Sequence, residues 1–301
     1  MPLKVLISND DGPPSQEESP FILPFLEHLE GLGWDVKVCL PNSQKSWISK
    51  SFMIKDHIEV SYYHRTTGET SVHRRADNDI VLLGGTPATC INIALNHIYK
   101  DENFDLVIGG PNFGRNSANI YTLSSGTVGA ALEGVMCGKK AIALSFAFYS
   151  RDFAKEKLKC ACEMASSVIE HLWNNRQDWP QEGLFNVNVP VVDEHRPVHL
   201  TRFHKTSYGS IFMPLQEGKP PSGTDEDSVE YNVRSEVEGH ESGRTIFHFA
   251  PDIRSMSHPK DAEPGTDAWA LNNKYVSVTP MAAAYEVAKL SNTFGFESHK
   301  L

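Results

Sequence analysis

The first two thirds of the chain alternate short apolar runs with amphipathic segments, and this alternation limits the possible folds more than any other feature. Residues 3–8 form a run rich in branched apolar side chains, which is typical of a buried strand. Residues 21–32 carry apolar side chains at helical spacing and end among glycines. Strand patterns recur at 35–40, 80–83, 105–108, 141–146 and 185–189, and helical patterns lie at 87–99, 125–136 and 153–173. The sequence therefore predicts an α/β fold with a mostly parallel sheet covered on both faces.

From about residue 197 the pattern changes to short strand-like runs separated by polar segments. Two such runs lie at 198–203 and 245–249, and residues 218–227 are predicted to form a mobile loop because they combine prolines, glycines and acids. Residues 275–279 return to a strand pattern, and 281–290 have the pattern of a closing helix. We therefore expect one domain, 1–301, made of a core (1–195), a β-rich extension (196–270) and a closing strand and helix (271–301).

Composition and charge argue against several classes of protein. Hydrophobic residues make up 40% of the chain, but no stretch approaches the roughly 18 apolar residues of a membrane span. The N-terminal apolar run is short and ends in two carboxylates, so it does not read as a signal peptide. The five cysteines lack the spacing of a metal site, which indicates reduced thiols and a cytoplasmic location. A net charge of −10 disfavours a nucleic acid polymer as partner, although a bound divalent ion could still attract a small anion.

Two adjacent carboxylates, Asp10 and Asp11, follow the first predicted strand. In open parallel sheets, ligands bind outside the carboxyl ends of the strands. Neighbouring carboxylates repel each other, and a hard divalent cation such as Mg²⁺ or Mn²⁺ would relieve that repulsion. The same residues, followed by Gly12, could instead form a surface turn, and the local sequence does not decide between the two.

Further polar groups follow other predicted strands. They comprise two asparagines in a glycine-rich loop, three small residues that open a helix, and a serine in a loop. In that order they are Asn112 and Asn116; Ser125, Gly126 and Thr127; and Ser46. Each group also has a local explanation, as a turn, a helix cap or a solvated loop. Together, amides, hydroxyls and a helix N-terminus at the ends of one sheet are what a phosphate-plus-metal site needs.

Several of these segments resemble signatures of the SurE (survival protein E) nucleotidase family. The matching strings, in the family's order, are residues 5–12 (VLISNDDG), 85–87 (GTP), 110–112 (GPN) with 114–116 (GRN), 125–128 (SGTV) with 133–134 (EG), 264–267 (PGTD) and 275–280 (YVSVTP). Residues 44–47 and 110–112 look closer to the fungal branch, which includes SurE-like acid phosphatases.

The resemblance implies a Rossmann-like three-layer core and a C-terminal β-hairpin extension that subunits exchange, and hence a homodimer or homotetramer. It implies metal-dependent hydrolysis of nucleoside 5′- and 3′-monophosphates, with Asp10 and Asp11 as the catalytic residues. One divalent ion, Mg²⁺ or Mn²⁺, would be held by Asp10, Asp11, Ser46 and Asn112. Phosphate contacts would come from Asn116, Ser125, Gly126 and Thr127.

The sequence leaves alternatives open at this point. Phosphoryl transfer could use a water activated by the metal or an aspartyl-phosphate at Asp10. The alternative function is a catalytically silent module that binds nucleotides or docks a partner. Trp47 stands where bacterial members usually have glycine, and its bulk could narrow the pocket or stack on a base. Asp267 is expected to shape the site or its packing.

Overall fold

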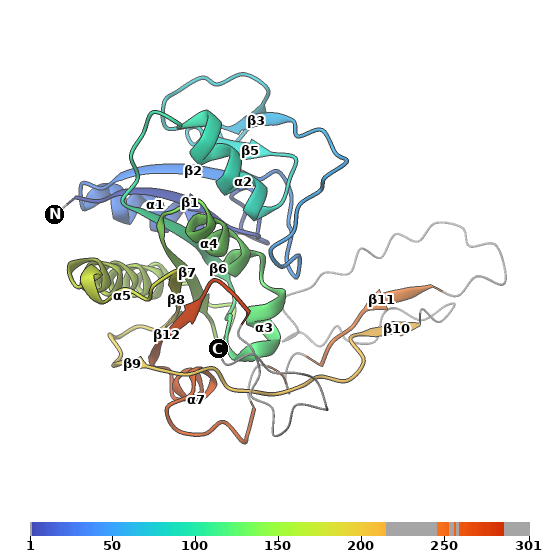
Figure 1. The fold of residues 1–301 in the computed structure, drawn as a ribbon, viewed down its shortest axis with the longest axis vertical. Coiled ribbons are helices and arrows are strands. Elements are labelled where there is room, and N and C mark those ends of the chain that lie inside the picture. Colours follow the sequence, from blue (N-terminus) through green and yellow to red (C-terminus); the bar gives the residue numbers. More distant parts are fainter. Residues whose placement is uncertain (1, 215–245, 253–255, 257–258, 286–301) are drawn as a thin grey trace, which may run out of the picture.

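The computed structural model describes residues 2–214, 246–252, 256 and 259–285. Within these residues the main sheet has ten strands in the order β4-β3-β5-β2-β1-β6-β7-β8-β12-β9 (Figure 1). All neighbours from β5 to β8 are parallel, whereas β3 is antiparallel to β4 and β5, and β12 is antiparallel to β8. The predicted α/β fold with a mostly parallel sheet is confirmed.

The strands and helices have the following bounds. The strands are β1 Lys4–Ser8, β2 Asp35–Pro41, β3 Val60–Tyr63, β4 Thr70–Ser71, β5 Ile80–Leu83, β6 Leu106–Phe113, β7 Lys140–Ala147, β8 Gly183–Pro190, β9 Val198–Leu200, β10 Phe212–Pro214, β11 Phe247–Phe249 and β12 Val276–Ala282. The helices are α1 Ile22–Gly31, α2 Pro87–Ile93, α3 Ala118–Ser124, α4 Gly126–Met136, α5 Lys155–Asn174 and α7 Asp267–Asn272.

Helices cover both faces of the sheet. Side chains of α1 and α5 share one apolar cluster with Val5 and Ile7 of β1. Side chains of α2 and α4 share a second apolar cluster with Leu6, which lies between Val5 and Ile7 in β1. Successive side chains of a strand point to opposite faces, so β1 supplies both clusters and reads as an unbroken apolar run.

Strand β6 is longer than the sequence predicts, because the glycines and proline at residues 109–111 lie inside the strand. Its pairing with β7 shifts between Gly109 and Asn112, as in a bulge. A Cβ on Gly109 would lie 2.2 Å from the carbonyl oxygen of Thr127, and one on Gly110 would lie 2.0 Å from that of Leu144. These glycines therefore permit a close approach of two backbones, and the strand continues to Phe113.

The stretch 196–270, expected as a β-rich extension, begins in the main sheet. Strand β9 pairs with β12 at the sheet edge. The chain then leaves the core, and β10 and β11 form a separate antiparallel pair that projects from the body of the molecule (Figure 1). The predicted mobile loop at 218–227 lies outside the described residues, and exchange of the extension between subunits stays a prediction.

Three helical segments differ from expectation. The closing helix predicted from residue 281 is wrong at its start, because Met281 and Ala282 continue β12 and pair with Leu184 and Gly183 of β8. Sheet pairing here overrides the helical pattern of the sequence. The remainder of that prediction, from residue 286, lies outside the described residues. Helices α3 and α7 were not predicted at all.

Candidate active site

The chain changes direction across the sheet at β1. It continues from β1 to β2 on one side and later places β6 on the other side of β1. In open α/β sheets this arrangement leaves a crevice at the carboxyl ends of the two strands, where ligands bind. Asp10 and Asp11 follow β1 and Asn112 lies near the end of β6, so the predicted carboxylates and asparagine meet at that crevice.

Asp10 lies at the N-terminus of helix α4 and is 2% exposed. Its Oδ2 accepts a 2.9 Å hydrogen bond from the backbone N–H of Gly126, and its Oδ1 accepts one from the hydroxyl of Thr127. The positive end of the helix dipole also favours a negative charge at this place. The helix end expected to bind phosphate is thus occupied by a carboxylate of the chain itself, and Gly126 and Thr127 hold Asp10.

Burial makes the charged form of Asp10 costly. It raises the pKa of the carboxyl group, against the lowering effect of the hydrogen bonds from Thr127 and Gly126. Within the described part of the chain, no basic side chain forms an ion pair with Asp10. A buried carboxylate in this condition is stabilised by any cation that reaches its remaining lone pairs.

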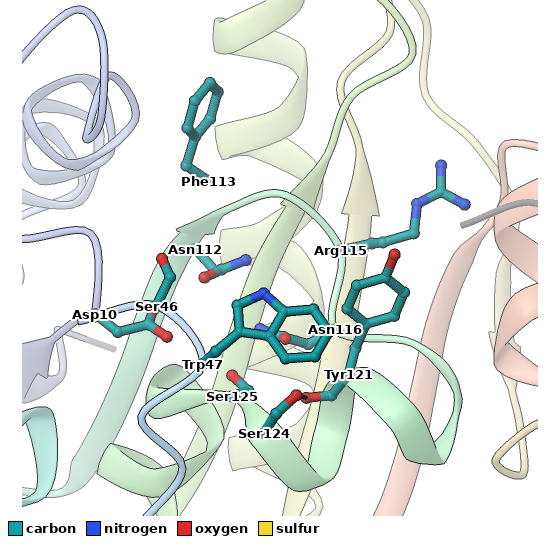
Figure 2. A pocket seen from close by; sticks show the side chains of 10 residues that line it. All are labelled: Asp10, Ser46, Trp47, Asn112, Phe113, Arg115, Asn116, Tyr121, Ser124 and Ser125. Atoms are coloured by element: carbon teal, nitrogen blue, oxygen red, sulfur yellow. Dashed lines mark hydrogen bonds between the residues drawn. The ribbon is translucent and has the colours of Figure 1, made fainter. Parts of the chain in front are cut away.

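Backbone N–H groups donate hydrogen bonds that fasten two further segments to Asp10 and Asp11. The Oδ2 of Asp11 accepts a 2.7 Å bond from the N–H of Phe113, which fixes the end of β6. The N–H of Lys45 donates to the carbonyl oxygen of Asp10 over 2.6 Å. This second bond brings Ser46 next to Asp10 (Figure 2).

Asn116 is held by three polar side chains from the neighbouring strands. Its N–H donates to Asn188 Oδ1 (2.8 Å), its Nδ2 donates to Ser145 Oγ (3.0 Å), and its carbonyl oxygen accepts from Asn186 Nδ2 (2.7 Å). This support was not predicted from the sequence. Two asparagines at alternate positions of the otherwise apolar strand at 184–189 could have indicated it, because buried polar side chains need hydrogen-bond partners.

One small pocket collects most of the predicted site residues. It has a volume of about 30 Å³ and is lined by Asp10, Ser46, Trp47, Asn112, Phe113, Arg115, Asn116, Tyr121, Ser124 and Ser125 (Figure 2). Asp11, Gly126 and Thr127 do not line it. Of the lining residues that sequence reasoning missed, Arg115 had the clearest signal, since it is a cation next to Asn116 in the glycine-rich loop.

The residues at this pocket fit a hard divalent cation. Among the described residues, no three histidine, cysteine or acidic side chains gather as a metal site, so a cation here needs neutral oxygens as well. Asn112 Oδ1 supplies one and lies 3.2 Å from Thr127 Oγ1, which links it to Asp10. Ser46 supplies a hydroxyl. Carboxylate, amide and hydroxyl oxygens are the donor set that Mg²⁺ and Mn²⁺ prefer.

Asp267 acts on the backbone rather than at the pocket. It is fully buried, and its oxygens accept hydrogen bonds from the N–H groups of Ala118, His204 and Ala268 (2.7, 2.8 and 2.8 Å). Burial raises the pKa of its carboxyl group, and these hydrogen bonds oppose that rise. Ala118 begins α3 with a left-handed φ of 60°, so Asp267 fixes the strained start of the helix that carries Tyr121.

Replacement of Asp267 by alanine is expected to destabilise the fold. Three buried N–H groups would lose their acceptor, which we expect to lower the free energy of unfolding by about 2 kcal/mol. Urea unfolding of Asp267→Ala measures this loss. Asp261→Asn serves as the control, because the Asp261 side chain is 82% exposed. A loss below about 0.5 kcal/mol, the range of ordinary surface changes, would show that Asp267 does not fix this region.

Comparison with known proteins identifies the family. The family model described as survival protein SurE matches residues 5–210. The chain belongs to the SurE family. Similar relatives include bacterial proteins named 5′-nucleotidase SurE; the one from Alkalilimnicola ehrlichii is 30% identical over 93% of this chain and 89% of its own length. Among solved structures, the SurE protein from Aquifex aeolicus is similar, with a TM-score of 0.66, 25% identity and 94% of each chain covered.

A fungal SurE-like relative is also similar. A Saccharomyces cerevisiae protein named probable tubulin–tyrosine ligase PBY1 is 32% identical over 94% of this chain. The chain spans only 41% of that relative's length.

Within the described residues, no helix is both long and apolar enough to cross a membrane.

Proposed function

We propose that this SurE-family chain is a divalent-metal-dependent phosphomonoesterase that hydrolyses nucleoside 5′- and 3′-monophosphates. The observation that carries the proposal is the buried carboxylate of Asp10, which has no basic partner in the described part of the chain and lies in a pocket of oxygen ligands and hydrogen-bond donors. The bacterial relatives named 5′-nucleotidase support the same reaction class.

Asp10, Ser46 and Asn112, which line the pocket, would hold the ion together with Asp11, which follows Asp10 but does not line the pocket. When bound, the ion supplies charge neutralisation for the phosphoryl group. Gly126 and Thr127 hold the Asp10 carboxylate through hydrogen bonds from the first turn of α4. Asp11 adds rigidity on the other side through its bond to the N–H of Phe113.

Ser125 and Asn116 are the proposed phosphate-binding side chains. Ser125 caps α4, because its Oγ accepts a 3.1 Å bond from the N–H of Val128. That geometry leaves the hydroxyl proton available to a phosphate oxygen in the pocket. Asn116 is already fixed by β7 and β8, so its side chain loses little conformational entropy when a ligand binds. Donors that are aligned before substrate arrives stabilise developing charge most effectively.

The position of Asp10 bears on the choice between a metal-activated water and an aspartyl-phosphate as the route of phosphoryl transfer. Both of its oxygens accept hydrogen bonds, from Gly126 and Thr127, and this supports a carboxylate that holds a cation over one that attacks phosphorus. We therefore propose water as the nucleophile. Trapping with a phosphate-mimicking metal fluoride would test this, since a covalent adduct at Asp10 would favour the aspartyl-phosphate route.

Metal removal tests the function directly. The experiment measures phosphate release from a panel of nucleoside 5′- and 3′-monophosphates, first with EDTA and then with Mn²⁺ or Mg²⁺ restored. We expect release to vanish with EDTA and to return with metal, because the ion is required for charge neutralisation. If no substrate yields phosphate with any metal, the chain is instead a silent nucleotide-binding or partner-docking module.

A further inference from the structure

The enclosed space of the pocket beside Asp10 is small. Its volume of about 30 Å³ holds about two water molecules. The pocket is open to solvent, so we place a phosphoryl group in this space, where it displaces the water, and the ribose and base beyond it. Three aromatic residues line the pocket, Trp47, Phe113 and Tyr121 (Figure 2). The ring of Phe113 stacks on Phe148 at 4.8 Å, so Trp47 and Tyr121 are the aromatic candidates for contact with the leaving group.

Trp47 has a backbone conformation that favours glycine. Its φ is 63°, in the left-handed region that is costly for a bulky side chain. Glycine would adopt the same backbone without that cost. A strained residue that lines a candidate site points to a function for its side chain.

Neighbouring aromatic rings hold the indole of Trp47. Its ring centroid lies 5.1 Å from Phe249, 5.8 Å from Tyr121 and 6.5 Å from Tyr208, in edge-to-face arrangements. Tyr121 comes from α3, whereas Tyr208 and Phe249 come from the stretch expected as the β-rich extension. The indole is thus fixed before a ligand arrives, which reduces the entropy lost on binding.

We propose that Trp47 is a specificity-determining residue whose indole stacks on the base of a nucleotide and selects leaving groups with a large flat ring. The inference rests on the proposed phosphomonoesterase function. Stacking of one base on an aromatic side chain strengthens binding about 5- to 150-fold. Purine nucleotides have the larger ring, so AMP and GMP are favoured over CMP and UMP, and ribose 5-phosphate, which has no base, is the poorest substrate.

The test compares kcat/KM for AMP with kcat/KM for ribose 5-phosphate in the metal-loaded full chain. We expect Trp47→Gly to reduce the ratio of the two values about tenfold or more, because only AMP loses a stacking partner. A general loss of folded enzyme cancels in the ratio. Trp47→Tyr, which keeps an aromatic ring, should restore most of it. If Trp47→Gly leaves the ratio unchanged, the ring serves packing alone; if the ratio rises, the ring blocks the base.

Direct binding separates this inference from the proposed function. If the wild-type chain hydrolyses neither compound, the phosphomonoesterase proposal fails, and titration calorimetry with AMP and ribose 5-phosphate then tests stacking alone. We expect wild type to bind AMP about tenfold more tightly than ribose 5-phosphate, and Trp47→Gly to bind the two alike. Equal affinities in wild type would overturn the role given to Trp47 whatever the activity.

Discussion

Asp10→Asn is expected to reduce kcat/KM for nucleoside monophosphates by about a thousandfold, which corresponds to about 4 kcal/mol of transition-state stabilisation. The substitution removes the negative charge that would hold the ion. It changes the shape of the side chain little, and the Thr127 hydroxyl can rotate to accept a bond from the new amide. Phosphate release with saturating Mn²⁺ measures the effect. Activity within tenfold of wild type would contradict the assignment of Asp10 as a metal ligand.

Thermal unfolding of the same variant separates loss of metal from loss of fold. Burial disfavours the charged form of Asp10, so in EDTA we expect Asp10→Asn to be as stable as wild type or more stable. At about one hundred times its Kd, Mn²⁺ should stabilise wild type by about 2.7 kcal/mol. The variant should show little of this increase. A variant that unfolds early in EDTA would indicate a structural role instead.

Gly126→Ala is expected to reduce kcat/KM about a hundredfold or more, because the site has no room for a methyl group there. An added Cβ would lie 2.7 Å from the Asp10 Cβ and 2.9 Å from its Oδ2, and 2.8 Å from the Ile48 Cγ2. Asp10 or α4 must then move, and a small misplacement of a catalytic group is enough to lose this much rate. The overcrowding should also cost about 1–3 kcal/mol of stability. Phosphate release and urea unfolding measure the two effects.

Gly134→Ala is the matched control for that experiment. Gly134 lies in the same helix, and its added Cβ would meet the Val107 side chain at 2.8 Å, far along α4 from Asp10. We expect a similar loss of stability but activity close to wild type. If both variants lose activity in parallel with stability, the effect of Gly126→Ala comes from the helix as a whole and not from the position of Asp10.

The core strands could be predicted because their sequence pattern and their environment agree. Strand β1 is buried on both faces, so residues 3–8 read as an apolar run, and the acids after it had to lie at the carboxyl ends of the parallel strands. Ser125 is the helix cap that its position suggested. In each case a short stretch of chain carries the whole signal.

Other parts of the site depend on contacts between distant segments. The glycines of β6 read as the end of a strand, yet they are needed where Thr127 and Leu144 approach the backbone. The start of α3 depends on Asp267, which follows it by 149 residues. The sequence gives no local sign of either contact, because the partner that requires the residue lies elsewhere in the chain.

The sequence alone determined the α/β class, the family resemblance and the set of oxygen-bearing residues, because periodicity and short motifs are local properties of the chain. Only the tertiary structure decided how those residues are used. It placed Asp10 at the N-terminus of α4, where Gly126 and Thr127 donate to a carboxylate instead of remaining free for phosphate. It also placed Trp47 in the pocket lining among rings from other segments. A hydrogen-bond donor serves whichever acceptor the fold brings within reach, and that choice is made by packing rather than by sequence spacing.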